Sequence, residues 1–163
     1  MPPLLVLDAE VELASAVGLR RMALRDFIAG YRKTLLQPGE FLAAVIVPTV
    51  PAGNSAFVKL GARKYLVISI VMVAAVVEKD RGGAVVSARI AVGSASEKAL
   101  RLHDLERELA GCAAGKAPSA LLRPEHFDCL SPIGDVRATA AYRLEAARQL
   151  VGEALDRASG FET

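Results

Sequence analysis

The 163-residue chain lacks most of the features that would place it in a simple class. Its 20 lysines and arginines nearly balance its 18 aspartates and glutamates, so it has no dense basic surface of the kind that nucleic-acid-binding proteins use. It has only two cysteines, Cys112 and Cys129, and we interpret them as reduced thiols because they form no CxxC or Cys/His array. The N-terminus has no signal-peptide pattern, so we expect a cytoplasmic protein.

The chain also lacks a membrane-spanning run. The apolar stretch from Val67 to Val77 is too short to cross a bilayer, which takes about 20 helical residues. It is rich in valine and isoleucine, whose branched side chains favour strands. We therefore expect no membrane partner and predict a strand that is buried on both faces.

Standard catalytic motifs are missing as well. The sequence contains no GxGxxG, Walker loop, HExxH or nucleophile elbow. His103 and His126 are isolated, and we predict exposed histidines rather than metal ligands. Asp104, Glu106 and Glu108 share a predicted helix with two arginines, which indicates a solvated, self-paired face. The residues alone therefore predict no catalytic or metal-binding group.

Apolar periodicity predicts strands in the first half of the chain and helices in the second. Strands are expected over residues 4–13, 20–24, 41–47, 55–60, 66–79 and 84–94, and helices over residues 99–110, 119–130 and 139–158. Residues 48–54 are rich in proline and glycine and form a candidate linker. The Asp80–Gly83 turn predicts a hairpin. The fold class is therefore α+β, an antiparallel sheet with helices on one face.

Two basic clusters are candidate binding residues. The first lies in the string Gly30-Tyr31-Arg32-Lys33-Thr34, which a Gln-Pro-Gly turn separates from the apolar run 41–47. The second comprises Lys59 and Arg63, followed by Lys64 and Tyr65, between two predicted strands. Arginine and lysine beside backbone turns suit phosphates or anionic rings. Solvated charge at strand ends is the alternative interpretation.

Together these strings resemble the FAD-binding subunits of molybdenum hydroxylases, the xanthine dehydrogenase and carbon monoxide dehydrogenase family. Residues 57–71, 88–93 and 131–143 also resemble segments of that family. The resemblance implies that residues 1–50 are the remnant of a second FAD-binding subdomain. It implies that residues 54–163 form a domain like the C-terminal domain of the carbon monoxide dehydrogenase flavoprotein, with helices covering an antiparallel sheet.

The resemblance implies three cofactor-binding residues. Lys59 falls where the family has a lysine near the flavin, and Leu42 falls where a strand leucine packs close to it. Arg63 falls in the loop that shapes the electrostatics and the access of nicotinamide. A cation there would stabilise negative charge on a reduced flavin. Val67 departs from the family, which usually has an aspartate at that position.

The family's upstream FAD region, with its glycine-rich diphosphate loop, has no counterpart in this sequence. A flavin diphosphate needs backbone N–H donors. We therefore expect FAD in the complete subunit and weak or no binding by this chain. The sequence is interpreted as a truncated gene product, an expressed fragment or one piece of a split subunit.

The resemblance thus implies part of an oxidoreductase subunit that frames the flavin and passes electrons from iron–sulfur clusters to an acceptor such as NAD. Its partners would be a molybdopterin-binding large subunit, an iron–sulfur small subunit and the missing FAD region, and the chain would be inactive alone. The alternative is a non-enzymatic subunit-docking or dimerisation module that no longer binds flavin. An incomplete sheet exposes apolar surface, which favours association, including a homo-oligomer.

Overall fold

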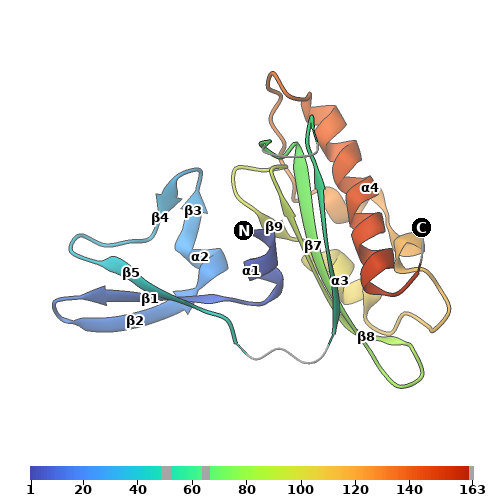
Figure 1. Cartoon of the computed structure of the whole chain (residues 1–163), viewed down its shortest axis with the longest axis horizontal. Helices are drawn as coiled ribbons and strands as arrows, with labels where there is room; N and C mark the ends of the chain where they lie inside the picture. Colours follow the sequence, from blue (N-terminus) through green and yellow to red (C-terminus); the bar gives the residue numbers. More distant parts are fainter. Residues whose placement is uncertain (49–52, 64–66, 162–163) are drawn as a thin grey trace.

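The structure is a computed structural model that describes residues 1–48, 53–63 and 67–161. The chain forms two lobes that lie side by side, with helix α1 (Pro2–Val6) between them (Figure 1). The N-terminal lobe contains β1 (Glu10–Ser15), β2 (Gly18–Ala23), α2 (Leu24–Phe27), β3 (Ile28–Gly30), β4 (Lys33–Thr34) and β5 (Phe41–Ile46). The C-terminal lobe contains β6 (Asn54–Leu60), β7 (Val71–Lys79), β8 (Val85–Gly93), β9 (Leu100–Arg101), α3 (His103–Leu109), two 3₁₀ turns (Pro118–Leu121 and Pro124–Phe127) and α4 (Ala140–Ala158).

The C-terminal lobe is an antiparallel sheet of order β6-β7-β8-β9, and α3 and α4 cover one face (Figure 1). Alternate residues of β7 point toward these helices and pack into their core: Val71, Val73, Ala75 and Val77. The residues between them, Ala74 and Val76, pack against Leu5 and Val6 of α1. The predicted α+β class and the predicted doubly buried strand are therefore confirmed.

The N-terminal lobe is a three-stranded antiparallel sheet of order β2-β1-β5. Val11 and Leu13 of β1 are buried against Leu24 and Phe27 of α2. Strand β5 lies at the edge, and its large apolar side chains remain exposed: Phe41, Leu42 and Val45. This lobe therefore presents an open apolar strand within the described part of the chain.

Three sequence predictions were wrong in detail. Residues 4–6 are helical, because Pro2 starts a helix whose Leu5 and Val6 are buried on the C-terminal sheet. Strand β7 begins at Val71 rather than at residue 66, which lies outside the described residues. The predicted helix 99–110 begins with strand β9, because Leu100 pairs with Val92 of β8.

The last helix was predicted well. Thr139 caps α4 by accepting the Tyr142 N–H at 3.2 Å, and Glu153 pairs with Arg157 at 2.5 Å. The expected helix 119–130 is instead two 3₁₀ turns, the second of which begins at Pro124.

Most of the predicted linker, residues 49–52, lies outside the described residues. Within the described residues no helix is both long and apolar enough to cross a membrane.

Candidate functional site

Leu42 lies on the open strand β5, where it pairs with the buried Leu13 of β1. Its side chain stays 44% exposed, and Val45, which pairs with Val11, is exposed to a similar extent. Other elements of the lobe cover Leu13 and Val11, but they do not cover Leu42 and Val45 on the neighbouring strand β5. Leu42 is therefore available to contact a further group.

Lys59 lies near the end of β6 and pairs with Met72 of β7. Its exposed amino group donates a hydrogen bond to the Val67 carbonyl at 2.8 Å, which joins the two ends of the β6–β7 connection. Arg63 is exposed in the same connection. Lys64 and Tyr65, the rest of this basic cluster, lie outside the described residues. The structure thus places Lys59 and Arg63 at one end of one hairpin.

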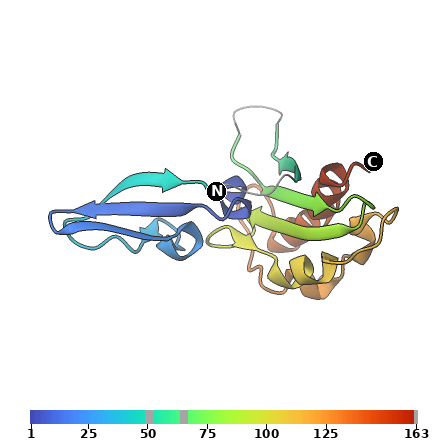
Figure 2. The same ribbon diagram turned by 90° about the horizontal axis from the view of Figure 1, so that it is seen from below.

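Leu42 belongs to the other sheet, on strand β5. Figure 2 shows β5, in cyan, along the same side as the described ends of the β6–β7 connection. An exposed apolar strand and a lysine on one side suit the edge of a flavin ring. The sequence has no glycine-rich loop for a diphosphate, so the residues present fit the ring but not the whole of FAD.

The other basic cluster lies on the short β3–β4 hairpin, which is hydrogen-bonded to two residues of the C-terminal lobe, Glu97 and Lys98. The Tyr31 N–H donates to Glu97 Oε1 at 2.9 Å. The next residue, Lys98, donates from Nζ to the Ile28 carbonyl at 2.8 Å. Arg32 has a left-handed backbone with φ of 54°, and the Tyr31 side chain is 70% exposed. The hairpin tip is therefore fixed on the C-terminal lobe with its ring facing outward.

A cleft of about 460 Å³ lies between this tip, α1 and the C-terminal sheet, and we call it the Tyr31 cleft. Its apolar lining comprises Pro2, Leu5, Ile28, Ile68, Met72 and Ile133. Its charged lining comprises Arg25, Arg32, Lys98, Arg137, Arg143 and Glu97. Cations outnumber carboxylates in this lining, so the cleft suits a ligand that is partly apolar and negatively charged.

Arg143 of α4 lies deepest among these cations, with only 4% of its surface exposed. Its guanidinium donates to the Ile70 carbonyl at 2.6 Å and to Asp135 Oδ1 at 2.8 Å. The Arg137 backbone N–H, with help from the Arg143 guanidinium, lowers the pKa of Asp135 to about 2. Arg143 Nε is also buried and has no hydrogen-bond partner among the described residues.

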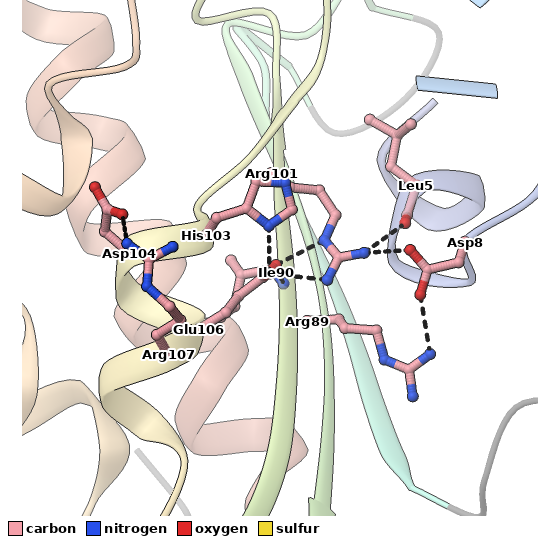
Figure 3. A network of polar contacts seen from close by, with 9 residues as sticks. All are labelled: Leu5, Asp8, Arg89, Ile90, Arg101, His103, Asp104, Glu106 and Arg107. Atoms are coloured by element: carbon pink, nitrogen blue, oxygen red, sulfur yellow. Dashed lines mark hydrogen bonds and ion pairs between the residues drawn. The ribbon is translucent and has the colours of Figure 1, made fainter. Parts of the chain in front are cut away.

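Two polar residues that the sequence predicts to be exposed are buried. His126 is buried, with Nδ1 accepting the Arg123 N–H at 3.1 Å and Nε2 lying 2.9 Å from Glu108. Glu106 is also buried and accepts the Ile90 N–H at 2.8 Å (Figure 3). Long-range pairing removes both groups from solvent, and helical spacing gives no sign of it.

The predictions for His103, Asp104 and the two cysteines are confirmed. His103 is exposed, and Asp104 pairs with Arg107 on the solvated side of α3. Cys112 and Cys129 are free thiols. Among the described residues, no group of three or more histidine, cysteine or acidic side chains is placed to hold a metal ion.

Comparison with known families gives two adjacent matches. The family described as the CO dehydrogenase flavoprotein C-terminal domain matches residues 56–158. The family described as the FAD binding domain in molybdopterin dehydrogenase matches residues 1–50. The carbon monoxide dehydrogenase medium chain of Afipia carboxidovorans is 32% identical over 162 residues, which is 97% of this chain and 55% of that protein. The alpha subunit of the 6-hydroxypseudooxynicotine dehydrogenase complex of Paenarthrobacter nicotinovorans is 28% identical over 95% of this chain and 52% of that subunit.

Solved structures show the same fold. Reconstituted CO dehydrogenase from Oligotropha carboxidovorans matches with a TM-score of 0.88 and 30% identity, over 99% of this chain and 57% of that one. Quinoline 2-oxidoreductase from Pseudomonas putida 86 matches with a TM-score of 0.86 and 28% identity, over 98% of this chain and 55% of that one. The chain therefore spans about half the length of the relatives that it matches.

Proposed function

The chain belongs to the family of FAD-binding medium subunits of molybdenum hydroxylases, and from this membership we propose that it is the C-terminal part of such a subunit. Residues 1–50 are the end of an FAD-binding domain, and residues 54–163 are the C-terminal domain. The observation that carries the proposal is the match in fold to a CO dehydrogenase over 99% of the chain at 30% identity. Two family matches that meet near residue 50 support the same division.

Leu42, Lys59 and Arg63 frame the flavin. Leu42 offers an exposed apolar side chain on β5. Packing a planar ring on this side chain is favourable because it removes apolar surface from water. Lys59 and Arg63 supply positive charge from one hairpin. Bound FAD supplies the electron transfer itself. The Val67 carbonyl holds the Lys59 amino group in place, so its charge is positioned before any cofactor arrives.

The Tyr31 cleft receives the electron acceptor, and NAD has the chemistry that it fits. NAD combines planar rings with a negatively charged diphosphate. The exposed Tyr31 ring offers a surface for stacking, and Arg32 and Arg143 offer positive charge.

The working assembly contains a molybdopterin-binding large subunit, an iron–sulfur small subunit and the upstream FAD region of the family. Electrons reach the flavin from the iron–sulfur clusters and leave to the acceptor. The open apolar strand β5 supports a second candidate function, a docking or dimerisation module that holds no flavin, because such a strand associates readily with another chain.

Co-expression of the chain with the upstream FAD region of its own coding sequence, read from the DNA before the Met1 codon, tests the proposal. We expect a yellow complex that survives gel filtration and whose flavin absorbance bleaches when NADH is added. Leu42→Asp should lose the colour, whereas Val86→Asp, at an exposed position on β8 of the other sheet, should keep it. A colourless complex with a folded chain would contradict the flavin role and favour the docking module.

A further inference from the structure

Arg101 of β9 is fixed on two of its three guanidinium nitrogens by a buried carboxylate. Nε and Nη2 lie 2.7 and 2.8 Å from the two oxygens of Glu106 on α3 (Figure 3). The side chains are only 10% and 9% exposed. Glu106 is itself anchored, because its Oε1 accepts the backbone N–H of Ile90 on β8. The guanidinium therefore has one orientation, set entirely by the C-terminal lobe.

The remaining nitrogen, Nη1, points away from that lobe to the start of the chain. It contacts the carboxylate of Asp8 and lies 3.4 Å from the Leu5 carbonyl. The other Asp8 oxygen lies 3.4 Å from Nη1 of Arg89 on β8. Asp8 has a left-handed backbone with φ of 49°, which turns the chain from α1 into β1. Arg101 thus bridges two segments that lie more than 90 residues apart in sequence.

Helix α1 depends on such outside support. Its five residues make less than two turns, and a helix this short is not stable in water alone. Arg101 provides a cation and a donor at the carbonyl end of the helix, where both are favourable. At the other end the helix sits on Gly93, where a Cβ would lie 2.9 Å from Pro2 Cγ and 3.0 Å from Met72 Cγ. Strand β8 therefore leaves room for α1 to approach.

Helix α1 is also one wall of the Tyr31 cleft, which Pro2 and Leu5 line opposite the hairpin tip, with Met72 beside them. We infer that Arg101 and Glu106 are positioning residues for this cleft: they fix its α1 wall from the far side of the sheet. The identity of the cleft's ligand rests on the proposed function, whereas the geometric claim does not. A buried ion pair contributes little net stability compared with apolar packing, but it fixes orientation.

Methionine-methyl NMR of the 163-residue chain tests the inference, because the sequence has only three methionines: Met1, Met22 and Met72. Met72 lies beside α1, and the amides of α4, which packs in the core on the other face of the sheet, serve as an internal control. Glu106→Gln keeps the shape of the side chain but removes the charge that holds Arg101. We expect the Met72 signal to shift, the α4 amide signals to stay, and the α1 amides to exchange about tenfold faster.

Asp8→Asn provides a second variant that leaves the buried pair intact, so the test survives if Glu106→Gln fails to fold. It should move the same Met72 signal. Arg107→Ala is the matched control, because it breaks an exposed ion pair on the same helix and should change neither reading. If Asp8→Asn, or a folded Glu106→Gln, lowers the melting temperature while the Met72 signal and α1 exchange stay unchanged, the pair contributes only stability and the inference is wrong. No reading depends on FAD or NAD, so the result is independent of the proposed function.

Discussion

The Glu97 carboxylate lies so close to Gly30 that a Cβ at position 30 would sit 2.6 Å from its Oε1. The same oxygen accepts the Tyr31 N–H at 2.9 Å. Lys98 then holds the Ile28 carbonyl, so two adjacent residues fix both ends of β3. Gly30 is therefore required for close approach rather than for an unusual φ angle. The glycine of the basic string is explained by a residue 67 positions later in the chain.

Gly30→Ala should displace the Glu97 carboxylate and break its bond to the Tyr31 N–H. Because the obstacle is the mobile end of an exposed side chain, the free energy of unfolding should fall by only about 1 kcal/mol. Urea denaturation measures this change. In a Glu97→Ala background the same substitution should cost much less, and an equal cost in both backgrounds would contradict the contact.

Two carboxyl groups with lowered pKa values make the stability of the fold depend on pH. The Arg20 side chain and then the Gln37 N–H lower the pKa of Glu40 to about 2, and the Arg137 N–H lowers that of Asp135 to about 2. Both groups are charged in the folded protein at a pH where unfolded carboxyls, with pKa values of about 4, take up protons. Their stabilisation is therefore complete above about pH 5 and is lost as the pH falls toward about 2.

Asp135→Asn should remove its part of that dependence. We expect the variant to be less stable than the parent at neutral pH, with the difference shrinking as the pH falls from about 5 to about 2. Thermal unfolding across this range measures it. Asp104→Asn, which removes a carboxylate from an exposed ion pair with Arg107, is the matched control. A difference that stays constant with pH would contradict the lowered pKa of Asp135.

Much of the fold could be predicted because its signals are local. The valine-rich run of β7 and the apolar stripe of α4 at Leu144, Ala147, Val151, Ala154 and Ala158 each follow from side-chain spacing. Helix α1 could not be predicted in this way. Leu4 to Val6 are all apolar and show no helical spacing, and the helix is favoured by Pro2 at its start together with the distant Arg101 and Gly93.

The residues of the candidate site also fall into a group that the sequence predicts and a group that it does not. The string around Tyr31 and the residues Lys59 and Arg63 stand out because basic residues gather beside turns. Glu97 and Arg143 gave no signal, because their partners lie dozens of residues away. A lone charged residue in a sequence normally indicates a solvated surface. Which charged residues are buried depends on the tertiary contacts that neutralise their charge.

The 163-residue chain alone should bind FAD weakly. Its residues offer an apolar strand and cations for the ring, but the sequence holds no glycine-rich loop to donate N–H groups to the diphosphate. We expect a dissociation constant of roughly tens of micromolar or weaker, equivalent to about 6 kcal/mol of binding free energy or less. Quenching of flavin fluorescence measures it. Stoichiometric FAD that remains through gel filtration would show that this prediction is wrong.

Lys59→Ala in the complete subunit should make the flavin reduction potential more negative or lower the occupancy of FAD. The physical reason is the loss of a cation beside a ring that gains negative charge on reduction. The free energy of unfolding should change by less than about 1 kcal/mol, because the amino group is exposed and its bond to the Val67 carbonyl lies at the surface. Redox titration and flavin absorbance measure the first effect, and urea denaturation measures the second.

Lys116→Ala, which removes an exposed lysine in the loop after α3, is the matched control and should leave the potential unchanged. An unchanged potential with full occupancy in Lys59→Ala would mean that Lys59 is only a solvated charge near the end of β6.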